Sequence, residues 1–270
     1  MKIKEIIIDS IKYPFLDWKK ILILGLIVVI YTIPHDMFPI NLQNGFIYPF
    51  LAVALLINFF ISGYFFKIIQ HSLKTKKELP KFSKWVNLFK NGFKVTFVSF
   101  IYSIPLTLPS IILNSSLLNF YSYIPAFFIY IMSAIGQIYF LQGYATWFLQ
   151  GYATTFFVDM LYFLIVFPIS LIAIANMANN DGKLSYAFEF KAIFDKIKNI
   201  GFINFYSWYF LASVISFLVL LIGITLMFIF SILIHSFQSV NLIDSLILTP
   251  YIYIFFSRSI ALIYQSDNTT

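Results

Sequence analysis

Two polar residues lie inside long apolar stretches of this sequence, where such side chains have few roles. Arg258 lies near the end of the last apolar stretch, and Asn58 lies in the middle of the second. Polar groups at membrane depth pair with one another, line a path or contact a ligand. Asn58 would form a hydrogen bond to another helix, worth about 1 kcal/mol. Arg258 would bind an anionic lipid or substrate, pair with Asp181 or Glu189, or extend to the headgroups, and the last role is favoured.

A second group consists of titratable side chains in the stretches expected on the outer membrane face. It holds two imidazoles and three carboxylates, which would suit a divalent cation. The members are scattered along the chain without a local spacing motif, so the sequence favours solvated loop residues over a metal or cation-entry site. The five candidates are His35, Asp36, Asp159, His235 and Asp244.

Enzyme signatures are missing from the sequence, and no cofactor is expected. It contains no HExxH, no GxSxG and no Walker loop. It contains no cysteine, which excludes disulfides, thiolate metal sites and cysteine nucleophiles. An aspartyl intramembrane protease needs two carboxylates within its crossings, whereas Asp159 is alone and near the edge of one. We therefore expect a protein that is not an enzyme.

The composition indicates which elements position these residues. The chain has 270 residues, of which 60% are hydrophobic and 11% are charged, whereas a soluble domain carries roughly 25% charged residues. One core of this size cannot bury so much apolar surface, so an integral membrane protein is predicted. The net charge of +7 then reflects lysines on the cytoplasmic side, and no nucleic acid is expected. The N-terminus lacks a small-residue cleavage site before an apolar run, so we expect it to be retained.

Six stretches have the length and apolar character that a crossing of the bilayer requires, which is about 20 residues. With the N-terminus inside, alternating crossings place all 18 Lys and Arg residues on the cytoplasmic side. A seventh crossing at 124–141 would move four lysines outside. We predict an all-α polytopic bundle, a single domain over 1–270, in the plasma membrane with both termini cytoplasmic. The crossings are 18–34, 47–70, 93–113, 157–178, 202–234 and 246–264.

Three cytoplasmic segments, each before an odd-numbered crossing, have apolar residues at helical spacing and charges on the opposite side. They are 2–12, a second that begins near Pro80 and ends at Lys94, and 186–198, which Gly201 would terminate. We predict amphipathic helices in the inner interface, each followed by a two-helix hairpin. Their lysines would meet anionic headgroups, at about 1 kcal/mol each. The candidates for lipid or partner binding are Lys84, Lys90, Lys196 and Lys198.

Segment 114–156 is apolar but interrupted, and it contains FLQGYAT twice, at 140–146 and 148–154. A step of eight residues rotates a helix by about 80°, so two helical copies face different directions, which argues against a paired site. The aromatic residues, among them Trp147, would form one arc of an uncharged helix suited to the outer interface. A strand remains an alternative, because eight is even. We predict an outer interfacial segment that does not cross the membrane.

Several short stretches carry a family resemblance. They are Lys12-Tyr13-Pro14-Phe15, Asp17-Trp18-Lys19-Lys20, Gly63-Tyr64-Phe65-Phe66, Glu78-Leu79-Pro80, Ile174-Ala175-Asn176-Met177-Ala178, the sequence IKNIGF at 197–202, and Phe256-Ser257-Arg258-Ser259 before Ile263-Tyr264. With them the chain resembles a family of archaeal and bacterial multi-pass membrane proteins, domain of unknown function 4013. The resemblance covers segment 114–156 poorly. It implies a membrane location and supplies no activity, substrate or catalytic residue.

The function that these features favour is a non-enzymatic membrane component. It would bind lipid or a partner through its basic inner helices and its aromatic outer segment, with anionic headgroups, a second protein or another copy of the chain as partner. The alternative is a transporter or channel, with Pro105, Pro109, Pro168 and Pro250 marking broken helices around a path. Transport usually places convergent polar groups at the midplane, which is nearly all apolar here, so it ranks second. An intramembrane enzyme ranks last.

Overall fold

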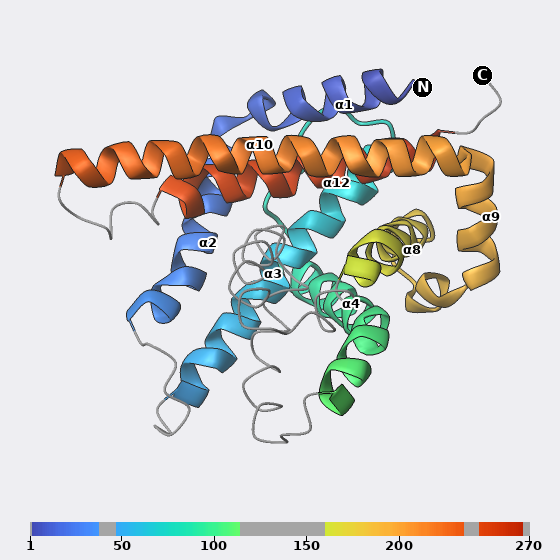
Figure 1. The fold of residues 1–270 in the computed structure, drawn as a ribbon, viewed down its shortest axis with the longest axis horizontal. Coiled ribbons are helices and arrows are strands. Elements are labelled where there is room, and N and C mark those ends of the chain that lie inside the picture. Colours follow the sequence, from blue (N-terminus) through green and yellow to red (C-terminus); the bar gives the residue numbers. More distant parts are fainter. Residues whose placement is uncertain (1, 38–46, 114–159, 235–242, 267–270) are drawn as a thin grey trace.

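The structure is a computed structural model that describes residues 2–37, 47–113, 160–234 and 243–266. Within these residues the chain is helical, and no strand is present. Figure 1 shows the beginning of α1 and the end of α12 at the same end of the molecule. The predicted outer segment 114–156 and Trp147 lie outside the described residues.

The N-terminal part of the chain forms a two-sided helix followed by a long apolar one. α1 (Ile3–Lys12) buries Ile6 and Ile7, while its lysines are exposed. A 3-10 turn, η1 (Tyr13–Leu16), carries the chain into α2 (Trp18–Met37). Asp17 begins α2, because its carboxylate accepts the backbone N–H of Lys20 at 3.3 Å. α1 lies along α12 and also contacts α10.

The helices α3 (Ile47–Leu73) and α4 (Trp85–Leu113) form an extensive pair. Each contributes a glycine at the crossing: a Cβ on Gly63 would overlap the carbonyl of Leu88, and one on Gly92 would overlap that of Phe59. Small residues allow such close approach of helix backbones in membranes. Gly25 of α2 similarly faces the backbone of Leu246.

α4 also corrects two predictions. A separate amphipathic helix from Pro80 to Lys94 is wrong, because one helix begins at Trp85 and continues through the predicted crossing 93–113. Pro80 lies in the preceding loop. Pro105 and Pro109 do not break the helix either, since its last turns run through both positions.

Two π-helical turns precede the buried helices of the second half. η2 (Tyr162–Val166) leads into α8 (Phe167–Asn179), and η4 (Asp244–Leu248) leads into α12 (Thr249–Gln265). Proline lies at the second position of α8 and of α12, where it cannot donate a helical hydrogen bond. The residue before each proline donates its N–H five residues back, and the hydroxyl of Tyr209 donates to the freed carbonyl of Phe163 at 2.9 Å. Pro168 and Pro250 therefore mark register shifts rather than broken helices.

The core lies around α8 and α12, which are buried over most of their length. η3 (Leu184–Phe188) and α9 (Phe190–Ile200) follow α8, and α9 leads through Gly201 into α10 (Phe202–Ile234). The indole of Trp208 on α10 donates to the hydroxyl of Ser259 on α12 at 2.6 Å. The opposite side of α10 is exposed and apolar, with Phe210 67% exposed.

Four helices are long and apolar enough to cross a membrane. Within the described residues they are Ala52–Leu73, Tyr162–Asn179, Phe202–Gly223 and Asp244–Gln265. The described residues of all six predicted crossings lie in helices, and the helix 202–234 has the predicted bounds. Six crossings remain a prediction, because α2 and α4 are not among these four helices.

Candidate functional site: a basic face around the end of helix α12

Arg258 is buried on α12 and is engaged by three different parts of the chain. Its side chain is 5% exposed. Nε donates to Asp9 Oδ1 at 2.7 Å, and Nη1 donates to the carbonyl of Lys76 at 3.1 Å. The guanidinium carbon lies 4.7 Å from the centre of the Tyr13 ring, a distance typical of a cation–π contact. Arg258 therefore connects α1, η1 and the loop after α3 to α12.

The partner of Arg258 corrects the sequence-based expectation. Asp9 lies 249 positions away in the sequence, whereas Asp181 and Glu189, which the sequence offered as partners, are both exposed. The Asp9 side chain is 40% exposed, so water reaches one end of the ion pair and not the other. A buried cation with one hydrated partner depends on that partner more than the partner depends on it.

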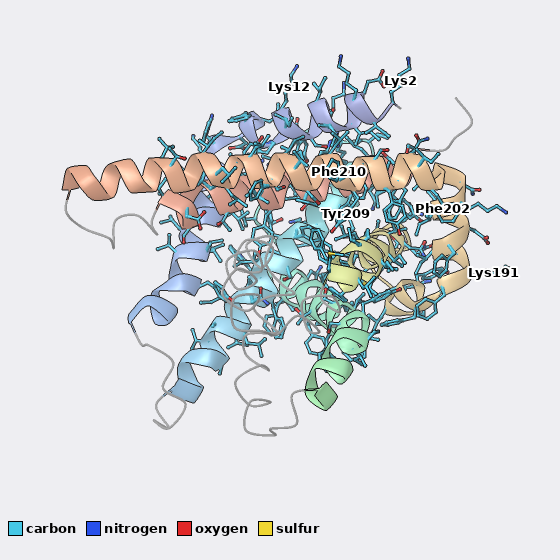
Figure 2. All side chains as sticks on the ribbon, in the orientation of Figure 1. Lys2, Lys12, Lys191, Phe202, Tyr209 and Phe210 are labelled. Carbon is cyan, nitrogen blue, oxygen red and sulfur yellow. The ribbon has the colours of Figure 1, made fainter. Side chains whose placement is uncertain are left out.

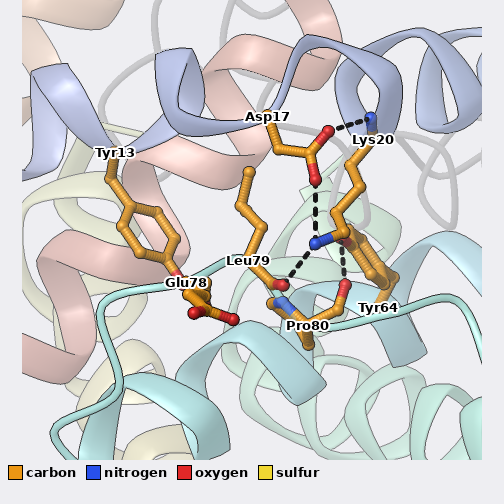
Figure 3. A network of polar contacts seen from close by, with 7 residues as sticks. All are labelled: Tyr13, Asp17, Lys20, Tyr64, Glu78, Leu79 and Pro80. Carbon is orange, nitrogen blue, oxygen red and sulfur yellow. Dashed lines mark hydrogen bonds and ion pairs between the residues drawn. The ribbon is translucent and has the colours of Figure 1, made fainter.

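Side chains from η1, α2 and α3 donate hydrogen bonds to backbone carbonyls of the 74–84 loop (Figure 3), and one from α12 donates to the residue before it. A loop without regular structure leaves these groups unpaired unless side chains or water bind them. The donors and distances are Tyr13 hydroxyl to Glu78 at 2.8 Å, Lys20 to Leu79 at 2.7 Å, Tyr64 hydroxyl to Pro80 at 2.9 Å, Lys67 to Lys81 at 2.6 Å and to Ser83 at 3.1 Å, and Gln265 to Leu73 at 2.7 Å.

Two groups beside this loop have shifted pKa values. Burial raises the pKa of the Tyr13 phenol above its ordinary value. The hydrogen bond from Lys20, whose ammonium lies 2.9 Å from the Asp17 carboxylate, lowers the pKa of Asp17. Tyr13 thus stays a neutral hydrogen-bond donor, and Asp17 stays ionised beside Lys20.

The 180–189 loop, which follows α8, is held in the same way. Lys94 donates to the carbonyl of Gly182 at 2.7 Å, and the Tyr102 hydroxyl donates to that of Ala187 at 2.9 Å. Asn176 donates to the carbonyl of Tyr186 at 2.8 Å and accepts the hydroxyl of Tyr264 at 2.7 Å. The last bond ties the loop to the end of α12.

Three segments thus meet the last turns of α12: α1 through Asp9, the 74–84 loop through the carbonyl of Lys76, and α9 through Lys196, whose ammonium lies 5.1 Å from the centre of the Tyr264 ring. We call the exposed lysines of these three segments the basic face. Figure 2 shows Lys2 and Lys12 projecting from α1, and Lys191 projecting from α9. The members are Lys2, Lys4, Lys12, Lys74, Lys76, Lys77, Lys81, Lys84, Lys191 and Lys198.

The structure separates the basic residues that the sequence proposed as one group. Lys84, Lys90 and Lys198 are exposed, whereas Lys196 is half-buried against Tyr264. Lys84 has a positive φ of 58° and directly precedes α4. Asn58 is 6% exposed within α3, as a helix-packing residue would be.

The predicted outer cation site falls mostly outside the described side chains. Asp159 and His235 lie outside the described residues, and His35 and Asp36 lie in a part of α2 where only the helix is described. Asp244 lies at the start of η4, where it accepts the Thr249 hydroxyl at 3.3 Å. Among the described residues no three acidic or histidine side chains form a metal-binding group.

Sequence reasoning missed the donors that hold the loops, although a signal for them was present. Tyr13, Lys20, Tyr64, Asn176 and Arg258 all fall within the short stretches that carry the family resemblance. Their common role as donors to loop carbonyls appears only when the loops are placed in space.

The fold and this site define a class: a helical protein whose described residues include four membrane-length apolar helices, with loops held by side-chain hydrogen-bond donors. The chain matches the family described as "Protein of unknown function (DUF4013)" over residues 46–230. It belongs to that family, which confirms the resemblance. No curated protein and no solved structure matches the chain.

Proposed function

We propose that this chain is an integral membrane protein that acts without enzyme chemistry, by binding anionic lipid headgroups through its basic face. One observation carries the proposal: three segments that bear exposed lysines, α1, the 74–84 loop and α9, each contact the last turns of a single helix, α12. Lysines near a charged membrane surface contribute about 1 kcal/mol each. Segments fixed by buried hydrogen bonds lose little further conformational entropy when they bind.

The topology that goes with this proposal has six crossings and cytoplasmic termini. Lysines concentrate on the cytoplasmic side of membrane proteins, and the basic face would therefore lie against the inner leaflet of the plasma membrane. The exposed apolar side of α10 would face lipid chains. The two-sided helix α9 suits the inner interface, with apolar residues inward and lysines outward.

The state of Arg258 weighs against transport. A transported anion would need an arginine with free donors along its path. Arg258 instead pairs with Asp9 and the carbonyl of Lys76, and it is 5% exposed. Substrate binding there would require α1 to leave its place on α12.

The proposal is tested by thermal unfolding of the full-length protein in a neutral detergent, with phosphatidylglycerol or phosphatidylcholine added. A ligand that binds the folded state raises the midpoint, by an amount worth about 2.7 kcal/mol at a hundredfold excess over Kd. We expect phosphatidylglycerol to stabilise the protein more than phosphatidylcholine, and salt to weaken the difference. Equal stabilisation by both lipids would contradict the proposal.

A further inference from the structure

The corner between α9 and α10 is rigid and carries exposed aromatic residues. α9 is packed on the core by Ile193, Ile197 and Ile200. Gly201, with φ 87°, ends it, and α10 begins at the next residue without a connecting loop. An L-residue with a side chain adopts this φ only at a cost, which explains glycine at the turn. Figure 1 shows α9 running across the direction of α10.

The outward surface of this corner alternates lysine with phenylalanine. Phe194 is three residues after Lys191 and four before Lys198, and residues at these spacings are neighbours on a helix surface. Phe194 is 48% exposed, and both lysines are exposed. Phe202 extends the apolar surface onto α10, where Ile203 is 83% exposed. We call residues 190–203 the elbow.

We infer that the elbow is the site on the basic face that selects an anionic phospholipid. The ammonium groups of Lys191 and Lys198 would bind the headgroup phosphate, and Phe194 and Phe202 would contact its acyl chains. Exposed aromatic side chains beside lysines are typical of helices that lie in the membrane interface. This inference rests on the proposed function and adds to it a location and a ligand class.

Two other charged residues of α9, Lys196 and Asp195, help to define the lipid site. Lys196 lies on another side of α9 and already contacts the Tyr264 ring, so it does not belong to the site. Asp195 is exposed and is the fourth residue after Lys191, which makes it a neighbour on the same side. Its negative charge opposes a phosphate, so its removal should strengthen binding.

The test measures the phosphatidylglycerol that remains with the full-length protein after gel filtration in neutral detergent. The double variant Lys191→Gln/Lys198→Gln removes two charges from the elbow. The matched control, Lys19→Gln/Lys183→Gln, removes two exposed charges that do not belong to the basic face. At roughly fivefold in affinity per lysine, the elbow variant should bind roughly 25-fold more weakly. The control should remain within about twofold, and Asp195→Asn should bind more tightly than the wild type.

Each outcome separates this inference from the proposed function. An equal loss in both double variants overturns both the elbow and the basic face as the source of the preference. No loss in either variant, while the wild type still prefers phosphatidylglycerol, overturns the elbow and leaves the other lysines of the basic face. No preference in the wild type for phosphatidylglycerol over phosphatidylcholine overturns both. Excess inorganic phosphate in the column buffer should not displace the lipid, because the phenylalanines bind chains that phosphate lacks. Displacement by phosphate would overturn the assignment to a lipid.

Discussion

The ion pair between Asp9 and Arg258 predicts an unequal response to loss of either partner. Asp9→Ala leaves a guanidinium that is 5% exposed without its counter-charge, whereas Arg258→Met leaves a carboxylate that is 40% exposed and reaches water. A hydrogen bond to a charged group contributes about 1.5–3 kcal/mol. We therefore expect Asp9→Ala to cost about 2 kcal/mol of unfolding free energy, and Arg258→Met about 1 kcal/mol, since methionine fills much of the same space.

The double variant tests whether the two effects share one interaction. Removing both partners leaves no uncompensated charge, so the combined cost should fall below the sum by about 1 kcal/mol. The assay is thermal unfolding in neutral detergent, followed by circular dichroism, where about 2 kcal/mol corresponds to a midpoint lowered by about 4–8 °C. Glu189→Ala is the control, because this exposed carboxylate was a partner that the sequence suggested for Arg258. It should change stability by less than about 0.5 kcal/mol.

Two results would refute this reasoning. If Asp9→Ala and Glu189→Ala unfolded at the same temperature, the contact between α1 and α12 would not stabilise the fold. If the effects of Asp9→Ala and Arg258→Met were additive, the two residues would not interact.

Three further predictions concern packing, pH and topology. Gly92→Ala places a methyl group against the carbonyl of Phe59 and should cost about 1–3 kcal/mol of unfolding free energy in the same assay. Gly223→Ala meets only a movable leucine side chain and should cost less. Equal costs for the two variants would contradict the close crossing of α3 and α4. The pKa of Asp17 is lowered, so its stabilising effect is complete above the ordinary pKa near 3.8 and is lost as the pH falls through the folded-state pKa. Asp17→Asn should therefore reduce stability slightly at neutral pH and not at the acid end, and a difference independent of pH would count against the ion pair. A cysteine at Thr75 should not react with a membrane-impermeant thiol reagent added to intact cells. Labelling from outside would contradict the cytoplasmic position of the 74–84 loop.

The long helices were predictable from sequence because they depend on local composition. Stretches of about 20 apolar residues in 202–234 and 246–264 have the composition of helices that cross membranes. The end of α9 at Gly201 was also predictable, since a positive φ favours glycine. The helix start at Pro80 was predicted wrongly. Proline suits the first turn of a helix, but here Tyr64 binds the Pro80 carbonyl and holds this segment as a loop.

The partners of the site were not predictable, because they depend on contacts between distant parts of the chain. Asp9 and Arg258 are separated by 249 positions, and several other acidic residues were equally plausible partners by charge alone. The close crossing at Gly63 and Gly92 likewise leaves no local pattern that distinguishes it from other glycines in apolar helices. Lys196 and Lys198 share one segment and one charge, and only the position of Tyr264 separates their roles.

The basic face is proposed to bind anionic lipid in the membrane. The most direct measurement is the ratio of anionic to zwitterionic phospholipid that copurifies with the full-length protein from its own membrane, determined by mass spectrometry of extracted lipids. We predict a ratio several times that of the surrounding membrane, reduced towards the membrane value by Lys191→Gln/Lys198→Gln. A ratio equal to that of the membrane in the wild-type protein would contradict the claim.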